Sequence, residues 1–508
     1  MKNENAKGSL MCHFYLRLQR WFLIVSVWLV GGVETGACRA RESESPVPPN
    51  LVFILLDNLG QEWLGCYGSE EGLTPNIDRL ARQGLRVEHC YTPPICGPSR
   101  ITALTGRYLL RSGMVMHHDA ALYSGGGLNP VREKTFARLL RDGGYHTAIT
   151  GKWQINNLYD EPGVLKQHGF EESLVWPGSI DRDKVTDEEF FRFQRLVEAA
   201  DTEFTSRFIS NIENRYWDPV FHRNGQREVH PGKFGPDVSQ EFAREFLRRP
   251  HDRPFLLYYP MVLTHGDTFL HPVVPTPLNR DPNRPHQEMF RDMVRYADLL
   301  IGDFLRELED SDHARRTIVF IATDNGTEKH RVARARGREI RGDLYQLTEA
   351  GSDVGLLVYA PGLVPGGRTI PLADFSDLLP TFCELARVPI PRDLKLDGRS
   401  FADAVLGNSA SGPREWIFNQ YGPMRVARNH RYKLYSDGRC YDVLQDFDEA
   451  HDLGPSQLPE HVAARAELQS VLDSLPPDAP PPFPLRSQTA FQRIQREREQ
   501  LPPVNSRD

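Results

Sequence analysis

The chain has 508 residues, of which 40% are hydrophobic and 25% charged, and its formal net charge is −7. This length exceeds the roughly 250–300 residues at which one core usually stops growing, so we expect more than one domain or a large domain with insertions. The mild charge argues against a nucleic-acid partner, and seven scattered cysteines argue against a disulfide framework, although pairing of Cys66 with Cys90 stays open.

The first 40 residues are typical of an export signal. Arg17 and Arg20 end a basic segment, and residues 21–33 form an uncharged apolar run that is shorter than the ~20 residues of a membrane span. We expect an exported protein, periplasmic or extracellular, with no stable membrane span after cleavage. The alternative is an uncleaved N-terminal anchor. Lipidation of Cys38 is disfavoured, because Thr35 stands where a lipoprotein signal usually has Leu.

Asn50 to Leu56 is a continuous apolar run, which predicts a strand buried on both faces. Asp57 and Asn58 follow it directly. The carboxyl end of such a strand is where an open α/β sheet places ligands, although a simple turn explains the same pair. Thr74-Pro75 then predicts a helix through Gln83, with Thr74 as its N-cap.

The stretch from Thr92 to Tyr108 reads T-P-P-I-C-G-P-S-R-I-T-A-L-T-G-R-Y. Pro98 suits the first turn of a helix, which puts Cys96 at or just before the helix N-terminus, where an anion is favoured. Arg100 lies one turn later on the same face. The residues alone also permit a plainer interpretation, a half-buried cysteine before a short helix.

The order C-G-P-S-R and then L-T-G-R resembles the signature of the type I, formylglycine-dependent sulfatases of the alkaline phosphatase superfamily. The resemblance implies that a formylglycine-generating enzyme oxidises Cys96 to formylglycine, an aldehyde, and that Arg100 holds this group and the metal site. One hydroxyl of the aldehyde hydrate attacks the sulfur of a sulfate ester, and the other lets the bound sulfate leave. In the family the first strand ends in two calcium-binding aspartates. Asp57 matches, whereas Asn58 keeps an oxygen ligand but loses the charge.

Residues 135–142 predict a short helix and residues 146–149 a strand. The following Gly151-Lys152-Trp153 resembles the family's G-K-W-H, in which the lysine grips sulfate and the histidine contacts formylglycine. Lys152 matches, but Gln154 replaces the histidine. Glutamine donates a hydrogen bond but cannot take up a proton near pH 7. We therefore predict that release of enzyme-bound sulfate is the step most at risk in this protein.

Residues 155–253 carry the least readable pattern. They resemble the variable region that builds substrate pockets in the family, and a purely structural surface insertion is an equal alternative. Phe255 to Tyr259 predicts another buried strand, which leads to His265. The resemblance gives His265 the role of protonating or holding the leaving oxygen, whereas a lone loop histidine is more often inert.

Residues 287–309 have apolar residues at helical spacing, and residues 317–322 predict a third buried strand that ends in Thr323-Asp324-Asn325-Gly326. This segment resembles the second metal segment of the family, in which Asp324 would also help to deprotonate the hydrate. The implied calcium ligands are oxygens and the modified cysteine: Asp57, Asn58, Cys96, Asp324 and Asn325. Hard oxygen ligands favour calcium, or else magnesium, over zinc.

The match weakens where the family carries a further lysine that contacts the bridging oxygen of the sulfate. The best alignment places Leu344 there. Arg336, Arg338 and Arg341 are close in sequence and could supply charge instead, although such a run is more often a solvated face.

The predicted fold is an α/β, alkaline-phosphatase-like sandwich with a mostly parallel central sheet, plus a smaller C-terminal α+β domain with an antiparallel sheet. We predict a catalytic domain at 50–405 with a variable insertion at about 155–253, a C-terminal subdomain at 413–475 that ends in a helix from residue 459, and a Pro-rich, charged tail at 476–508. Within 354–360 we expect one more strand.

The predicted function is hydrolysis of a sulfate ester, in particular of a sulfated carbohydrate. Catalytic roles are assigned by resemblance to Cys96, Arg100, Lys152 and His265, and substrate binding to Lys152, Gln154 and His265. Two alternatives stay open: a catalytically weakened homologue that binds sulfated glycans, which the departures at Asn58, Gln154 and Leu344 favour, and a phosphate or phosphonate monoesterase on the same scaffold.

Overall fold

The computed structural model describes residues 47–116, 127–159, 161–178, 214–265, 274–275 and 285–480. The expected export signal, the possible lipidation site at Cys38 and the tail beyond residue 480 lie outside the described residues. From Pro48 onward the described chain belongs to one compact unit. No helix in the described part has the length and apolar character needed to cross a bilayer.

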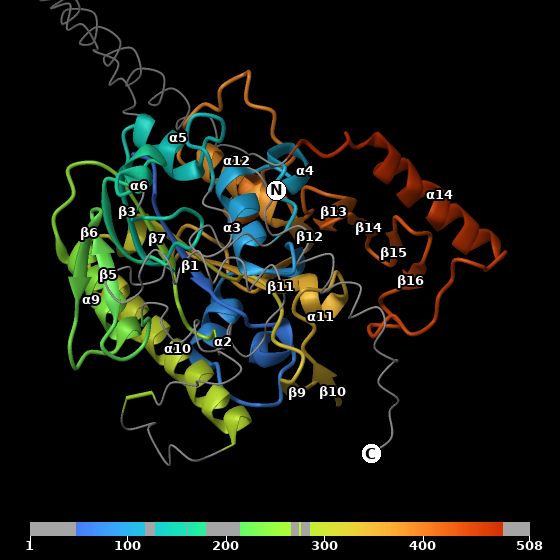
Figure 1. Ribbon diagram of the computed structural model, residues 1–508, viewed down its shortest axis with the longest axis horizontal. Coiled ribbons are helices and arrows are strands. Elements are labelled where there is room, and N and C mark those ends of the chain that lie inside the picture. The colour runs from blue at the N-terminus through green and yellow to red at the C-terminus, as the bar shows by residue number, and fades with distance from the viewer. Residues whose placement is uncertain are drawn as a thin grey trace, which may run out of the picture. The chain divides into compact units, whose positions relative to one another are not determined.

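A ten-stranded sheet forms the centre of this unit, in the order β12-β2-β11-β8-β1-β7-β3-β4-β5-β6 (Figure 1). Most neighbours are parallel, and β11 and β5 run antiparallel to theirs. This confirms the predicted, mostly parallel α/β sheet. Its strands are β1 (Asn50–Leu56), β2 (Leu85–Tyr91), β3 (His146–Lys152), β4 (Glu172–Trp176), β5 (Val220–Arg223), β6 (Gln226–Val229), β7 (Phe255–Pro260), β8 (Thr317–Thr323), β11 (Asp353–Tyr359) and β12 (Arg368–Asp374).

Both faces of the sheet are covered, because alternate residues of β1 enter two different hydrophobic cores. Phe53 and its neighbours at 51 and 55 pack in one core, and Ile54 with its neighbours at 52 and 56 packs in the other. The first core is closed by α3 (Cys96–Thr105), α5 (Phe136–Asp142), α12 (Leu378–Leu385) and α13 (Ala402–Leu406). The second is closed by α2 (Pro75–Gln83), α9 (Gly235–Arg248) and α10 (His286–Glu309).

The C-terminal part forms a separate four-stranded antiparallel sheet, as predicted, in the order β13-β14-β15-β16. Helix α14 (Pro459–Ser474) lies beside this sheet (Figure 1). Leu468 and its neighbours pack in the core that the helix shares with the sheet. The strands are β13 (Trp416–Tyr421), β14 (Met424–Asn429), β15 (Tyr432–Tyr435) and β16 (Cys440–Asp442).

Short elements complete the chain. A two-stranded hairpin joins β9 (Val332–Ala335) to β10 (Arg338–Arg341). The one-turn α-helices are α4 (Leu109–Ser112), α6 (Val164–Gln167) and α11 (Glu349–Ser352), and short 3-10 turns lie at Gln61–Trp63, Gly65–Tyr67, Ala314–Arg316 and Phe375–Asp377.

Three local expectations differ from the structure. Strand β3 continues to Lys152, beyond the predicted end at Ile149, because Gly151 and Lys152 pair with β4. Thr74 is the N-cap residue of α2, but its hydroxyl accepts from the Gly65 N–H and donates to Asp78 instead of capping the helix. The pairing of Cys66 with Cys90, which the sequence left open, is not formed, since both are free thiols.

Candidate active site

The candidate site lies where four neighbouring parallel strands end. In the order of the sheet these are β8, β1, β7 and β3. Asp324 follows β8 and Asp57 follows β1, while Lys152 is the last residue of β3. The carboxyl edge of an open parallel sheet is the usual place for ligands. Because strands that are distant in sequence are adjacent in this sheet, the predicted motifs meet at one point.

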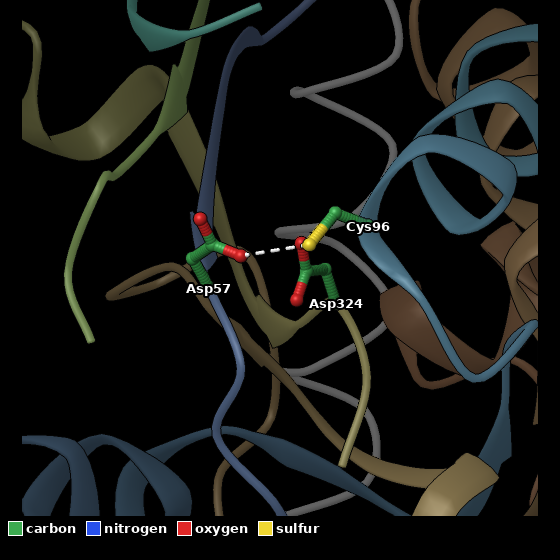
Figure 2. A group of neighbouring side chains, drawn as sticks. All are labelled: Asp57, Cys96 and Asp324. Carbon is green, nitrogen blue, oxygen red and sulfur yellow. Dashed lines mark hydrogen bonds between the residues drawn. The ribbon is translucent and has the colours of Figure 1, made fainter. Parts of the chain in front are cut away.

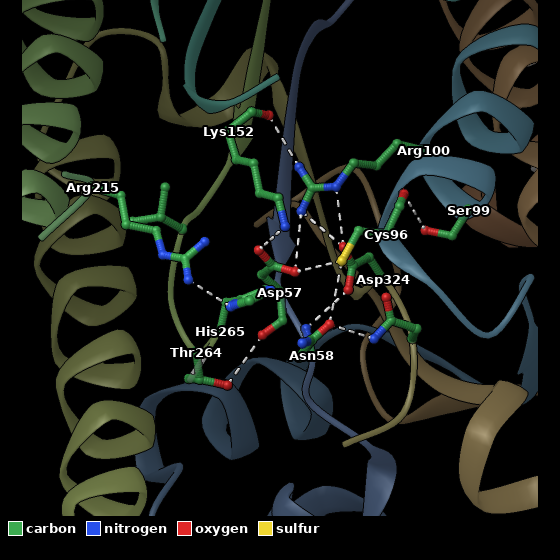
Figure 3. A network of polar contacts seen from close by, with 12 residues as sticks. Asp57, Asn58, Cys96, Ser99, Arg100, Lys152, Arg215, Thr264, His265 and Asp324 are labelled. Atoms are coloured by element: carbon green, nitrogen blue, oxygen red, sulfur yellow. Dashed lines mark hydrogen bonds and ion pairs between the residues drawn. The ribbon is translucent and has the colours of Figure 1, made fainter. Parts of the chain in front are cut away.

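Cys96 approaches this edge from the first turn of α3, as the sequence predicted. Its Sγ lies 3.2 Å from Asp57 Oδ1 and 3.4 Å from Asn58 Oδ1 (Figure 3). Burial raises the pKa of the thiol well above its usual range, and the charge of Asp57 adds to this effect. A thiol that resists deprotonation is a poor nucleophile. The surroundings of the unmodified cysteine therefore do not activate it as a thiolate.

Two buried cations face the two buried carboxylates. Lys152 Nζ donates to Asp57 Oδ2 at 2.6 Å, and both side chains are fully buried. Arg100 donates from Nε and Nη2 to Asp324 Oδ2 at 3.1 and 2.8 Å, and from Nη1 to the carbonyl of Lys152 (Figure 3). Charge-assisted bonds of this kind hold the groups in fixed orientations.

The two carboxylates differ in their pKa. Burial by itself would raise the pKa of Asp57, but the charges of Lys152 and Arg100 outweigh it and lower this pKa. Burial, reinforced by the charge of Asp57, raises the pKa of Asp324 to about 6. Asp57 therefore stays ionised, and Asp324 is the better proton acceptor of the two near neutral pH.

The oxygen atoms at this edge suit a hard divalent cation. Ligand atoms of Asp57, Cys96 and Asp324 all lie within 4.8 Å of one another (Figure 2). Asn325 is fully buried, and its Oδ1 has no hydrogen-bond partner among the described residues, while its Nδ2 donates to Asn58 Oδ1 at 2.7 Å. A buried amide oxygen without a partner is costly unless something else binds it. The donor set of carboxylate and amide oxygens fits calcium or magnesium.

A second acidic cluster, made of His89, Glu349 and Asp353, has the spacing of a metal site. Its carboxylates are already paired, because Lys433 Nζ lies 3.0 Å from Glu349 and His89 Nδ1 lies 2.7 Å from Asp353. Glutamine and backbone donors complete the contacts of Asp353. This cluster is best explained as a structural ion-pair network.

His265 lies beyond the end of β7, as expected. Arg215 donates from Nη2 to His265 Nδ1 at 2.9 Å (Figure 3). Its guanidinium also lies over the ring of Trp176. A guanidinium only donates, so Nδ1 accepts and the proton of the neutral ring is on Nε2. Sequence reasoning missed Arg215, because it lies in the insertion where no pattern was readable.

The remaining candidates are placed as follows. Gln154 is nearly buried two residues after Lys152, in the left-handed region with φ 55°. Leu344 packs in the same hydrophobic cluster as Cys96 and brings no charge.

The nearby arginines serve other contacts. Arg336 bonds the carbonyl of Tyr67 and the side chain of Gln61, and Arg338 pairs with Asp448. Arg341 is exposed and donates to the carbonyl of Lys329. None of these contacts brings Arg336, Arg338 or Arg341 to Cys96.

Comparison with known proteins finds sulfatases among those that are similar to this chain in sequence. The family model Sulfatase matches residues 49–388. Steryl-sulfatase of Mus musculus is 29% identical over 454 residues, which cover 78% of this chain and 71% of that protein. Arylsulfatase A of Homo sapiens is 31% identical over 392 residues, with 73% and 70% covered.

Solved structures share the fold. Ps i-CgsB has a TM-score of 0.69 at 21% identity, covering 89% of this chain and 98% of that one. BT4656, in complex with its substrate D-glucosamine-2-N,6-O-disulfate, has a TM-score of 0.61 at 19% identity, covering 88% and 98%. At these identities the likeness concerns the alkaline-phosphatase-like architecture of the chain.

Proposed function

The chain belongs to the sulfatase family, and we propose that it removes sulfate from a sulfated carbohydrate by S–O cleavage, with a bound calcium ion and formylglycine formed from Cys96. The observation that carries this proposal is the convergence of Asp57, Cys96 and Asp324 within 4.8 Å at one sheet edge, with Lys152 and Arg100 beside them.

Formylglycine at position 96 would supply, as its hydrate, an oxygen nucleophile and a second hydroxyl that permits sulfate to leave. Asp324 Oδ1 accepts a hydrogen bond from the Asn58 N–H, while Oδ2 accepts two from Arg100. Since a carboxylate oxygen has a second lone pair, Oδ1 is suited to take the proton of the nucleophile. Arg100 keeps this carboxylate oriented and buried.

A calcium ion held by Asp57, Asn58, Asp324 and Asn325 would polarise the sulfate as a Lewis acid and orient the nucleophile. Lys152 bonds Asp57 through one of the three N–H groups of its ammonium. The others can turn to a sulfate oxygen, so the same side chain would fix both a ligand carboxylate and the substrate. Magnesium is the alternative occupant.

His265 would serve the leaving group. Arg215 holds Nδ1 as an acceptor, so Nε2 is the atom that presents a proton. A hydroxyl of a sugar is a poor leaving group, and a hydrogen bond from Nε2 to the departing oxygen would stabilise the negative charge that develops on it.

A catalytically weakened homologue that binds sulfated glycans is the second candidate. Two observations favour it: Gln154 replaces a residue that exchanges protons, and Leu344 puts an apolar side chain in the cluster of Cys96. Saturable glycan binding without turnover would identify it. A phosphate or phosphonate monoesterase remains the third candidate.

The test is turnover by protein co-expressed with a formylglycine-generating enzyme. The panel should contain sulfated glucosamines and galactans, a steryl sulfate, aryl sulfates and an aryl phosphate, because the relatives include a steryl-sulfatase and a neighbour whose substrate is a disulfated glucosamine. Cys96→Ala should abolish hydrolysis, whereas Cys383→Ala, which removes another buried thiol, should not. A mass spectrum of the peptide around Cys96 reports conversion. Hydrolysis that survives Cys96→Ala, or that is confined to the phosphate, would refute the proposal.

A further inference from the structure

The side chain of Asn58 is held at both ends. Its Oδ1 accepts from Asn325 Nδ2 at 2.7 Å and lies 3.4 Å from Cys96 Sγ, so it faces the candidate metal site. Its Nδ2 points the other way and donates to Glu328 Oε1 at 3.2 Å. Asn58 is almost fully buried. Glu328 therefore lies directly behind the residue that departs from the family pattern, on the side opposite the metal site.

The charge around the site makes this position significant. Asp57 and Asp324 are each paired with a cation, Lys152 and Arg100 respectively. These four residues together bring no surplus of negative charge to a divalent ion. Asn58 brings none either, and calcium affinity depends on the number of charged ligands.

Glu328 is a further carboxylate next to a predicted ligand. It lies three residues after Asn325, and the shielded Oε2 accepts no hydrogen bond among the described residues. Arg331 Nε is 3.9 Å from this oxygen. Among the described residues, the side-chain hydrogen bond that Glu328 accepts comes from Asn58 Nδ2.

The orientation of Asn58 matters because an amide has two unlike ends. Only the oxygen binds a cation, and an NH₂ group in its place would repel the ion. An acceptor behind Asn58 selects the rotamer with the oxygen forward, and a carboxylate acceptor also polarises the amide. Residues that hydrogen-bond to a metal ligand without contacting the metal typically lower metal affinity about 10-fold to 100-fold when they are mutated.

We propose that Glu328 is a positioning residue of the metal site. It holds Asn58 Oδ1 toward the ion, and its carboxyl group polarises the Asn58 amide. This compensates in part for the negative charge that Asn58 does not bring to the site. This inference rests on the proposed function, since it requires that Asn58 binds a cation. It makes the Asn58–Glu328 pair the functional equivalent of a single carboxylate ligand.

The experiment is a double-mutant cycle read as calcium affinity by titration calorimetry, on the full chain with unmodified Cys96. Glu328→Gln should weaken calcium binding about tenfold, because the carboxylate is removed. In the Asn58→Asp background the same change should alter affinity less than threefold, because the introduced carboxylate carries its own charge and has no amide to orient. The double variant should bind calcium at least as well as the wild-type protein. Glu339→Gln, which removes an exposed charge on β10, is the matched control and should leave affinity unchanged.

The outcomes separate the two proposals. If the wild-type protein binds neither calcium nor magnesium, the metal part of the proposed function fails, and this inference fails with it. If the wild-type protein binds calcium and Glu328→Gln binds it equally well, or loses the same factor in both backgrounds, only the role of Glu328 is overturned. Circular dichroism of each variant shows that affinities refer to folded protein. A Glu328→Gln variant that folds only together with Asn58→Asp would also support the coupling.

Discussion

The pairing of Lys152 with Asp57 can be tested by removing the ammonium and asking whether calcium compensates. Lys152→Met keeps the length of the side chain and removes its charge. Both partners are fully buried at 2.6 Å, and breaking such a pair typically costs about 3–5 kcal/mol of folding free energy. Arg100 Nη2 remains 3.7 Å from Asp57 Oδ1, so we expect a loss near the lower end of that range, about 3 kcal/mol.

Calcium should recover part of this loss. The calcium ion and the Lys152 ammonium compete for the same carboxylate, so removal of the ammonium should tighten calcium binding. Each tenfold gain in calcium affinity adds about 1.4 kcal/mol to the free energy of unfolding at saturating ion. The assay is urea unfolding with calcium and with a chelator. Lys433→Met is the matched control, because Lys433 is equally buried and pairs with Glu349 and Glu449 away from the site.

The control should be destabilised without a larger response to calcium than the wild-type protein shows. An equal calcium response in Lys152→Met and Lys433→Met would refute the reasoning, because it would show that the ion does not share Asp57 with Lys152. Lys152→Met should also lose sulfatase activity even where calcium restores its stability.

Three further predictions concern single side chains. Gln154→His should raise the steady-state rate about 10²–10⁴-fold without changing a product burst in quenched-flow experiments; an unchanged steady-state rate would show that sulfate release is not limiting. His265→Gln should lower kcat/KM far more for sugar sulfates than for nitrophenyl sulfate, and equal losses would exclude a role at the leaving oxygen. Burial lowers the pKa of His168 to about 4, from 6.5, so the unfolded chain takes up this proton first as the pH falls. Unfolding free energy should then drop by up to about 3 kcal/mol between pH 6.5 and 4, and His168→Gln, measured by urea unfolding, should flatten this slope.

The sheet and the core of the site were predictable because their signals are local. Buried parallel strands are short apolar runs, and β1 begins and ends where the sequence placed it. Asp57 and Asp324 follow such runs directly, and Cys96 lies in a contiguous motif. The order of the strands then brings them together. Local periodicity does not contain that order, and it was not predicted from the sequence.

The missed features depend on contacts between distant segments. Arg215 reaches His265 across 50 residues, and Glu328 reaches Asn58 across 270; neither has a local signature. The hydroxyl of Thr74 was misjudged as a cap because a nearby loop offers it the Gly65 N–H. In each case the hydrogen-bond partner of a polar side chain is determined by the tertiary structure and not by the neighbouring sequence. The division into residues 50–405 and 413–475 stays a prediction.

The burial of Cys96 has a consequence for the proposed conversion of this residue to formylglycine. Only 2% of this residue is accessible to solvent, and every residue of α3 around it is buried. An oxidising enzyme needs the thiol and several flanking residues in an open conformation, which the folded chain does not offer. The proposed conversion should therefore happen while the polypeptide is still unfolded. If purified, folded protein with an unconverted Cys96 is treated with a formylglycine-generating enzyme, Cys96 should stay unconverted unless the protein is first denatured.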